Sequence, residues 1–457
     1  MNKSANQRPL IKYSSVLVIV MCTIATSGQM QKLRIAENDR FLVKEDKTPF
    51  VWVGDTNWFF AKLPPTVIDS ILDNRREQGF TIMLISCREK LYNGDGPGSL
   101  KNPNQKWWSY LDEYIAKCEE RNLYVGLTLG WWGLAKRNSA KSLYDFGKWV
   151  GNRYKNRNNI VWLTLGEAGS HSRENGIENE KISMLVKGIR DGDTGHKLLT
   201  IHADYRRGTS ISKDGDICDF NNWQTSQWCC LEDLPRNDER TWTVWETITY
   251  DYNKTYNGKH KPTLDSEAWY ENNKDFCGTT PFNIRRRAYF TIFAGAFGHT
   301  YGAGGIWDGL KLEKGCSNKA LDAIHYIGAR HMGYLSRFLH NLGDDYLKLH
   351  PDQSIIVEGN SDNYDTHIQA TKAVDNSFAL IYSASDAPYV IDMSKLSKHT
   401  LSAIWYDPRN NEYKREHVPV SNKPSHQSFD PPGKSGPGND WVLILSDKLA
   451  VDNFPLQ

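Results

Sequence analysis

The sequence predicts a (β/α)8 barrel followed by an antiparallel β-sandwich, and three observations lead to this prediction. The chain has 457 residues, more than a single core usually fills, so one large and one smaller domain are expected. From residue 50 to about residue 341, short apolar runs alternate with amphipathic stretches, as in repeated βα units. After about residue 343, the pattern changes to short strands separated by turn residues.

Eight apolar runs are the expected barrel strands. They cover residues 50–54, 81–86, 124–129, 160–165, 197–202, 217–222, 262–266 and 296–301. Parallel strands joined by short right-handed crossovers close as a barrel and leave no edge strand. The alternative, an open doubly wound sheet, usually has a Gly-rich phosphate loop after an early strand. The first strand ends instead in Gly54-Asp55-Thr56-Asn57-Trp58, which favours the barrel.

Amphipathic stretches between these runs predict the helices. They cover residues 64–78, 105–121, 141–156, 177–190, 238–256, 282–293 and 319–339. In the second stretch, Trp107, Leu111, Tyr114, Ile115 and Cys118 form one apolar face. The strands expected in the sandwich cover residues 354–357, 367–370, 378–383, 389–392, 401–407 and 441–445.

The expected domain boundaries are a signal peptide over residues 1–28, the barrel over 29–342 and the sandwich over 343–457. Basic residues, a short apolar run at 16–22 and small residues at 25–28 follow in the order of a secretory signal. A retained N-terminal anchor is the alternative. We therefore expect export to the periplasm or the exterior of a bacterium. Residues 29–49 are expected to form a small strand or hairpin outside the barrel.

The composition argues against nucleic acid as a partner. The formal net charge is +2, and removal of the basic residues at positions 3, 8 and 12 brings it to about −1. The 16 Trp and 22 Tyr exceed what a core needs, and flat rings can stack on sugars. No CxxC pair is present, which argues against zinc-ribbon and thioredoxin sites. Most cysteines after Cys22 are expected to be reduced core residues. The oligomeric state stays open.

Two carboxylates stand where predicted strands end, on the barrel face that carries reacting groups. Glu167 follows the fourth strand, and Glu267 follows the seventh. Side chains from these strands face one another across the barrel mouth, so one can protonate a glycosidic oxygen while the other attacks the anomeric carbon. We predict Glu167 as the acid/base and Glu267 as the nucleophile of a retaining glycosidase. For each residue the alternative is a surface ion pair.

Other strand ends supply polar and aromatic side chains for a sugar cleft. The predicted substrate-binding residues are Asp55, Trp58, Arg88, Trp131, Trp132, His202, Asn222, Trp223, His299, Tyr301 and Trp307. Asp55 is the most specific of these, because an acid after an apolar strand can hold a sugar hydroxyl. Core packing is the competing explanation for any single Trp or His. The sequence has no HExxH and no EF-hand loop, so no metal and no cofactor are expected.

Several segments resemble glycoside hydrolase family 140, the apiosidase-like enzymes. They are residues 54–58, 74–80, 124–127, 264–271 and 293–302. The segments 390–396, 405–409, 431–433 and 440–443 resemble the collagen-binding-type β-sandwich that follows the catalytic domain in that family. The resemblance implies a (β/α)8 fold, hydrolysis of apiosyl linkages in the pectin side chains of rhamnogalacturonan II, and bacterial export.

The resemblance also implies that Glu267 is the nucleophile, but the acid/base position departs from the family pattern. The family usually shows Gly-Gly-Asp after strand four, where this chain has Leu165-Gly166-Glu167. The longer side chain reaches further into the cleft, which bears on the substrate more than on the reaction class. One alternative is a carbohydrate-binding or adhesin-like protein that has lost activity. Another is an inverting enzyme, whose carboxyls lie about 6.5–9.5 Å apart instead of about 5–5.5 Å.

Overall fold

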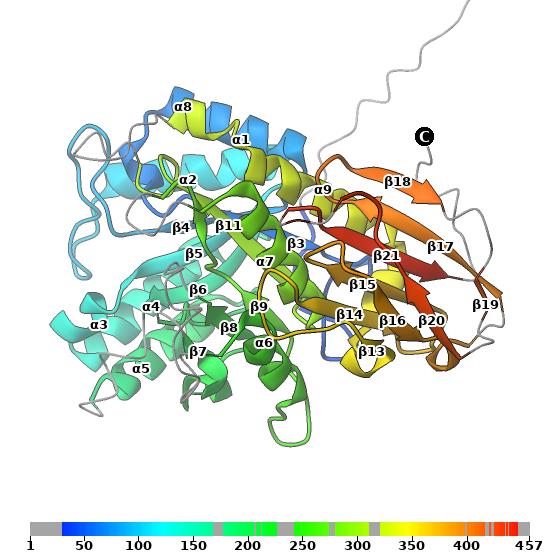
Figure 1. Cartoon of the computed structure of the whole chain (residues 1–457). Coiled ribbons are helices and arrows are strands. Elements are labelled where there is room, and N and C mark those ends of the chain that lie inside the picture. Colours follow the sequence, from blue (N-terminus) through cyan, green and yellow to red (C-terminus); the bar gives the residue numbers. More distant parts are fainter. Residues whose placement is uncertain are drawn as a thin grey trace, which may run out of the picture.

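The computed structural model describes residues 30–446, apart from several internal segments (Figure 1). These segments are residues 168–176, 205–206, 212, 226–241, 274–278, 310–319, 398–399, 416–419, 422–424, 435 and 437. The predicted signal peptide lies outside the described residues. Figure 1 shows the two parts of the chain side by side, the barrel in blue to yellow-green and the antiparallel sheets in yellow to red.

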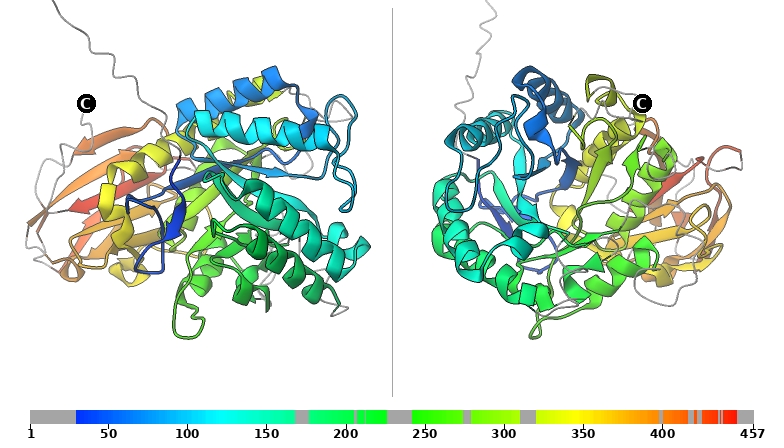
Figure 2. Two further views of the ribbon diagram at one scale, coloured as in Figure 1. Left: turned by 180° about the vertical axis from the view of Figure 1, so that it is seen from behind. Right: turned by 90° about the vertical axis from the view of Figure 1, so that its left-hand side faces the viewer.

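A curled, mostly parallel sheet forms the first part, with the strand order β6-β5-β4-β3-β11-β9-β8-β7. Seven of the predicted strands are found in it: β3 (Trp52–Thr56), β4 (Ile82–Ser86), β5 (Tyr124–Trp131), β6 (Ile160–Gly166), β8 (Asn221–Gln224), β9 (Thr263–Asp265) and β11 (Gly298–Ala303). Two short strands were not predicted, namely β7 (Arg207–Gly208) and β10 (Tyr270–Glu271). Seen from the end in Figure 2, helices surround the sheet as in a barrel.

The fifth predicted strand, residues 197–202, forms only an isolated parallel bridge between Leu199 and Trp162 of β6. On the β6 side, Thr200 donates from its backbone N to Trp162 O at 2.8 Å. On the other side, Asp219 N donates to Leu199 O at 2.8 Å. The segment thus connects β6 to the chain that enters β8. On the β8 side, the neighbouring chain begins as a 3-10 helix, Lys213–Ile217, instead of a strand.

Helices form within each predicted amphipathic stretch, with shifted ends, and one short helix at 133–137 was not predicted. They are α1 (Pro65–Gln78), α2 (Gln105–Glu120), α3 (Gly133–Arg137), α4 (Ala140–Tyr154), α5 (Ile177–Gly192), α6 (Val244–Asn253), α7 (Pro281–Phe293), α8 (Ala320–Ala323) and α9 (Ile327–Asn341). A capping box of Thr243 and Glu246 fixes the start of α6, later than predicted. The last predicted helix is divided into α8 and α9. Among the described residues, no helix is long and apolar enough to cross a membrane.

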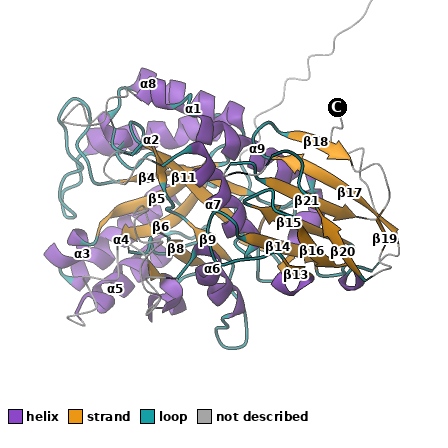
Figure 3. Ribbon diagram, viewed as in Figure 1, coloured by secondary structure: helices purple, strands orange, loops and turns teal. Residues whose placement is uncertain are grey.

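An N-terminal hairpin and two antiparallel sheets complete the fold. The predicted hairpin is confirmed, with β1 (Leu33–Ile35) paired to β2 (Leu42–Lys44). One sheet of the second part has the order β12-β14-β15-β21-β17-β18, with β19 beside β17, and the other has the order β13-β16-β20. Their strands are β12 (Leu349–Pro351), β13 (Ile356–Glu358), β14 (Ile368–Ala373), β15 (Phe378–Ser383), β16 (Tyr389–Asp392), β17 (Thr400–Asp407), β18 (Glu412–Arg415), β19 (Val420–Ser421), β20 (His426–Phe429) and β21 (Trp441–Ser446). Figure 3 shows that strands dominate this sandwich.

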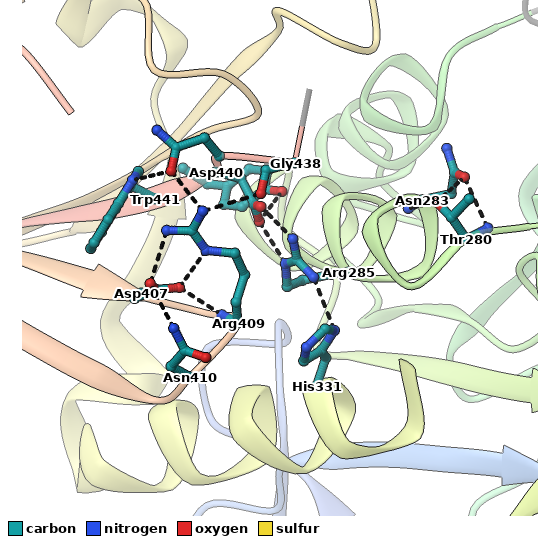
Figure 4. Close-up of polar contacts among 12 residues, drawn as sticks. Thr280, Asn283, Arg285, His331, Asp407, Arg409, Asn410, Gly438, Asp440 and Trp441 are labelled. Atoms are coloured by element: carbon teal, nitrogen blue, oxygen red, sulfur yellow. Dashed lines mark hydrogen bonds and ion pairs between the residues drawn. The ribbon is translucent and has the colours of Figure 1, made fainter. Parts of the chain in front are cut away.

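A buried ion pair joins the barrel to the sandwich (Figure 4). Arg285 of α7 donates from Nε to Asp440 Oδ2 at 2.7 Å, and its Nη2 also contacts Asp440. Tyr382 of β15 donates to the same carboxylate at 2.9 Å. The Tyr382 ring also stacks on Tyr289 of α7, with centroids 4.8 Å apart. Loss of one partner from such a buried pair costs about 3–5 kcal/mol, so this contact holds the two parts together.

The buried cysteines agree with the sequence-based expectation as far as the described residues extend. Cys87, Cys118 and Cys218 are all buried. Burial raises the pKa of the Cys87 and Cys118 thiols, so both stay protonated at neutral pH. The other predicted core cysteines, at positions 229, 230, 277 and 316, lie outside the described residues.

His331 gives the stability of this junction a pH dependence. Arg285 donates from Nη1 to His331 Nδ1 at 2.9 Å, which requires that nitrogen to be unprotonated. Burial and the charge of Arg285 lower the pKa of His331 to about 4, whereas the unfolded value is about 6.5. Between these two pH values the unfolded chain binds more protons, so the free energy of unfolding decreases as pH falls.

We expect His331→Gln to remove this part of the acid destabilisation, worth up to about 3 kcal/mol. Thermal unfolding midpoints at about pH 7 and about pH 4.5 would show a smaller difference for His331→Gln than for the unchanged chain. His426→Gln, at an exposed sandwich position, is the matched control. An equal pH difference in all three proteins would contradict this role of His331.

Candidate active site

The two predicted catalytic carboxylates follow strands β6 and β9, at the carboxyl edge of the sheet. Glu167 is half-buried, and Glu267 is 4% exposed. Parallel strands present their carboxyl ends at one edge of a barrel, where ligands have access. The fold therefore delivers both carboxylates to the face on which chemistry is expected.

Both carboxylate oxygens of Glu267 are held by neighbouring side chains. His202 Nε2 lies 2.7 Å from Glu267 Oε2, and the Tyr270 hydroxyl donates to Glu267 Oε1 at 2.8 Å. Trp58 donates in turn from Nε1 to the Tyr270 oxygen at 2.7 Å. An ionised carboxylate only accepts hydrogen bonds, so His202 carries a proton on Nε2 when Glu267 is charged. These contacts fix the orientation of the Glu267 carboxylate.

A second row of polar groups holds His202 itself. His202 Nδ1 lies 3.0 Å from Ser266 Oγ, and Ser266 Oγ donates to Asn222 Oδ1 at 2.5 Å. Asn222 belongs to β8, and Ser266 directly precedes Glu267. The network therefore links Asn222 of β8 to Ser266 and Glu267, which follow β9, and to His202 beside β6. It orients the imidazole ring of His202 toward Glu267.

Glu167 lies in a different electrostatic environment. Burial raises the pKa of its carboxyl, and the negative charge of Glu267 raises it further. Positive charge from His202 and Arg88 acts in the opposite direction and lowers this pKa. A raised pKa keeps a carboxyl protonated at higher pH, which is what a proton donor needs.

The backbone at the end of β6 is irregular and directs Glu167 out of the strand. Thr164 and Glu167 have φ angles of 44° and 51°, in the left-handed region that glutamate rarely adopts. The register between β5 and β6 shifts at Thr128 and Gly130, as in a β-bulge. Gly166 lies under the Trp131 ring, since an added Cβ would be 1.8 Å from Trp131 Cε3. Glycine before the acid therefore makes room for the tryptophan.

Aromatic rings gather beside Glu267. The Trp58 ring centroid lies 4.9 Å from His202 and 5.4 Å from Trp131. Trp307 lies 5.8 Å from Tyr270, and the Arg88 guanidinium lies 5.9 Å from the Trp131 ring. Within the described part of the chain, the buried indole N–H groups of Trp131 and Trp307 have no hydrogen-bond partner.

Trp132 lies next to Trp131 in the chain but belongs to the start of α3, where Lys136 approaches its ring to 5.3 Å. Of the predicted binding residues, Trp58, Arg88, Trp131, His202, Asn222 and Trp307 thus lie around Glu167 and Glu267 in the structure.

Asp55, predicted to hold a sugar hydroxyl, is paired with a helix residue in the structure. Asp55 is wholly buried and accepts from Arg75 of α1 at 2.6 Å. Successive side chains of a strand point to opposite faces, and Asp55 points outward to the helices. Tyr301 lies in the same outer layer, because its hydroxyl donates to Glu271 Oε2 at 2.7 Å and its ring is 5.7 Å from the Arg75 guanidinium. Both residues support packing between the sheet and α1.

Trp223 and His299 are likewise turned away from the carboxylates. Trp223 donates from Nε1 to Asp251 Oδ2 of α6 at 2.6 Å. His299 Nδ1 lies 3.5 Å from Asp265 Oδ2 in the neighbouring strand. Both side chains are buried, and both connect strands to the surrounding helices or to each other. The structure thus shows contacts within the barrel for these two predicted binding residues.

Tyr270 and Ser266 were not among the predicted site residues, although both contact the central network. Their only signal in the sequence is proximity to Glu267 in Ser266-Glu267-Ala268-Trp269-Tyr270. Among the described residues, no group of three or more His, Cys, Asp or Glu side chains could hold a metal ion.

The sandwich reaches the segment that carries Glu267. Tyr364, between β13 and β14, stacks at 6.4 Å on Trp269, two residues after Glu267. Its hydroxyl accepts a hydrogen bond from the first backbone N–H of α6, that of Val244, at 3.0 Å. Arg287 of α7 lies 4.5 Å from the Trp269 ring and donates to Thr225 O at 2.8 Å. The sandwich therefore packs behind the Glu267 segment.

Comparison with protein families finds matches for both parts of the chain. The family described as "Apiosidase-like, catalytic domain" matches residues 36–344. The family described as "Putative collagen-binding domain of a collagenase" matches residues 350–446. These matches confirm the predicted apiosidase-like catalytic domain and the collagen-binding-type domain that follows it. No curated protein matches the chain.

Solved structures with the same fold cover nearly the whole chain. One described as a glycoside hydrolase has a TM-score of 0.80 at 24% identity, over 92% of this chain and 97% of its own. One described as a glycoside hydrolase family 5 protein from Bacteroides vulgatus has a TM-score of 0.83 at 25% identity, over 93% of this chain and 96% of its own. They confirm the predicted fold class.

Replacement of Gly166 by alanine should displace Trp131 and, with it, Glu167. We expect Gly166→Ala to lower kcat/KM by about 100-fold, the scale of a misplaced catalytic group, with little change in the unfolding midpoint. Gly96→Ala is the matched control, because an added Cβ there would meet only Lys90 at 3.7 Å. Equal activity of both variants would show that the Trp131 contact does not position Glu167.

Replacement of Tyr364 tests whether the sandwich positions the Glu267 segment. We expect Tyr364→Ala to lower kcat by about 10-fold or more with a smaller change in KM, because Trp269 loses its support. Tyr364→Phe keeps the ring and should recover most of kcat. Tyr389→Ala, in the core of the sandwich itself, controls for general destabilisation. A similar loss of kcat in Tyr389→Ala would contradict a specific role for Tyr364.

Proposed function

The chain belongs to the apiosidase-like family of glycoside hydrolases, and we propose that it cleaves its glycan with retention of configuration. Glu267 acts as the nucleophile and Glu167 as the acid/base. The observation that carries this proposal is the contrast between the two carboxylates. Glu267 accepts hydrogen bonds on both oxygens, whereas burial and the charge of Glu267 raise the pKa of Glu167. Such a contrast separates an ionised nucleophile from a protonated acid.

In the first step, Glu167 donates its proton to the glycosidic oxygen as the bond to the leaving sugar breaks. A carboxylate oxygen of Glu267 attacks the anomeric carbon and forms a glycosyl ester. Glu167, now ionised, removes a proton from water, and the resulting attack on the anomeric carbon releases the sugar and restores Glu267. Two inversions at the same carbon give net retention.

The proposed substrate is a complex plant glycan with pectic, apiosyl-type linkages. Membership of the apiosidase-like family supports this proposal. The partly buried rings of Trp131 and Trp307 and the exposed Arg88 guanidinium supply the mixed apolar and polar surface that an oligosaccharide needs. Export is proposed as well, because residues 1–28 have the order of a secretory signal.

We expect the unchanged protein to release sugar from rhamnogalacturonan II or arabinogalactan oligosaccharides, and to give first the product with the anomeric configuration of the substrate. Glu267→Gln should abolish release. Glu167→Gln should lower kcat by about 10²–10⁴-fold and remove the loss of activity that deprotonation of Glu167 causes at high pH. Chromatography of products measures release, and NMR spectra taken in the first minutes identify the anomer.

Glu120→Gln, whose side chain is 71% exposed, is the matched control and should retain full activity. A first product of inverted configuration would contradict the retaining mechanism and support an inverting one. Glycan binding without sugar release by the unchanged protein would instead support the carbohydrate-binding alternative.

A further inference from the structure

A groove lies where helix α6 meets the first strands of the sandwich, and Figure 1 shows α6 beside β14 there. Its volume is about 510 Å³, within the range of small-molecule sites. The lining combines α6 residues, such as Glu246, Tyr250 and Asn253, with His350 and Gln353 of the sandwich. None of its residues belongs to the group around Glu167 and Glu267.

Two aromatic side chains form one wall of this groove. Trp242 precedes α6, and Tyr250 lies within it, with ring centroids 5.0 Å apart and planes inclined by 50°. Tyr250 is 39% exposed, which is unusual among the large apolar side chains described. Tyrosine and tryptophan that expose a ring while keeping a polar edge are typical of binding surfaces.

Polar groups face the same groove. Glu246 and Asn253 lie seven residues apart, two turns along one face of α6. His350 uses Nδ1 for the Tyr252 hydroxyl, at 3.0 Å, which leaves Nε2 as the nitrogen that can contact a ligand. Among the described residues that line the groove, there is one carboxylate and no lysine or arginine. This charge pattern disfavours uronates, phosphates and nucleic acids and suits a ligand that is neutral and rich in hydroxyl groups.

We propose that the groove is a second carbohydrate-binding site, which holds one or two neutral sugar units of a polymeric glycan. The apolar faces of the sugars lie against Trp242 and Tyr250, and their hydroxyls contact Asn253 and His350. The inference rests on the proposed function in one respect, namely that the substrate is part of a longer glycan. Binding at the groove keeps the polymer near the barrel while the site at Glu267 acts on it.

The test separates binding at the groove from catalysis. Full-length Glu267→Gln protein is run in native gels that contain rhamnogalacturonan, arabinogalactan or no polysaccharide, and retardation gives the affinity. We expect at least one polysaccharide to retard it, and Trp242→Ala/Tyr250→Ala in the same background to weaken that affinity by about 10-fold or more. Tyr92→Ala, at a tyrosine that is 52% exposed elsewhere, is the matched control.

With Glu267 intact, the Trp242→Ala/Tyr250→Ala variant should hydrolyse short oligosaccharides at an unchanged rate and show a raised KM only for the polymer. Tyr250→Ala alone should raise KM for the polymer to a smaller extent. Because Tyr250 is a surface position, this raised KM would not come from a folding defect. The proposal is overturned if no polysaccharide retards Glu267→Gln, or if the groove variants bind as tightly as their parent. A failure of the proposed function would appear differently, as retained binding without hydrolysis by the unchanged protein.

Discussion

The hydrogen bonds to the two oxygens of Glu267 are the constraint on which the site depends. One comes from His202, at the end of the segment that lies beside β6. The other comes from Tyr270, whose hydroxyl in turn accepts a hydrogen bond from Trp58. Three separate parts of the barrel must therefore be in place before this carboxylate has its orientation. Donors fixed in advance need not reorganise during a reaction. The aromatic rings beside Glu267 belong to the same set of residues, so substrate binding and carboxylate orientation share one framework.

Most barrel strands could be predicted because parallel strands buried on both faces appear as continuous apolar runs. Residues 197–202 have such a run, but a ladder also needs an extended neighbour. The neighbouring chain begins as a 3-10 helix at 213–217. This cannot be predicted from the apolar run at 197–202. The prediction of helix ends was limited in a similar way, because local contacts fix them. At α6, the cap formed by Thr243 and Glu246 decides where the helix starts.

The placement of Glu167 and Glu267 after β6 and β9 was predictable because position at a strand end is a property of the sequence order. The face of the sheet that a side chain occupies is not given by this order, since a shift of one residue along the strand reverses it. Asp55 and Tyr301 follow the strand-end rule yet point outward, where they contact Arg75 of α1 and Glu271 of β10. The importance of Tyr270 is also invisible before folding, because only the structure brings its hydroxyl to Glu267 and its ring beside Trp307.

The ion pair between Arg285 and Asp440 bears on how this protein can evolve. Exchange of the sandwich between enzymes would require a junction that tolerates a new partner. Here recombination at residue 343 would leave Arg285 buried without its carboxylate and Trp269 without the Tyr364 ring. The two parts are therefore expected to have been inherited together, with substitutions at the junction constrained in pairs.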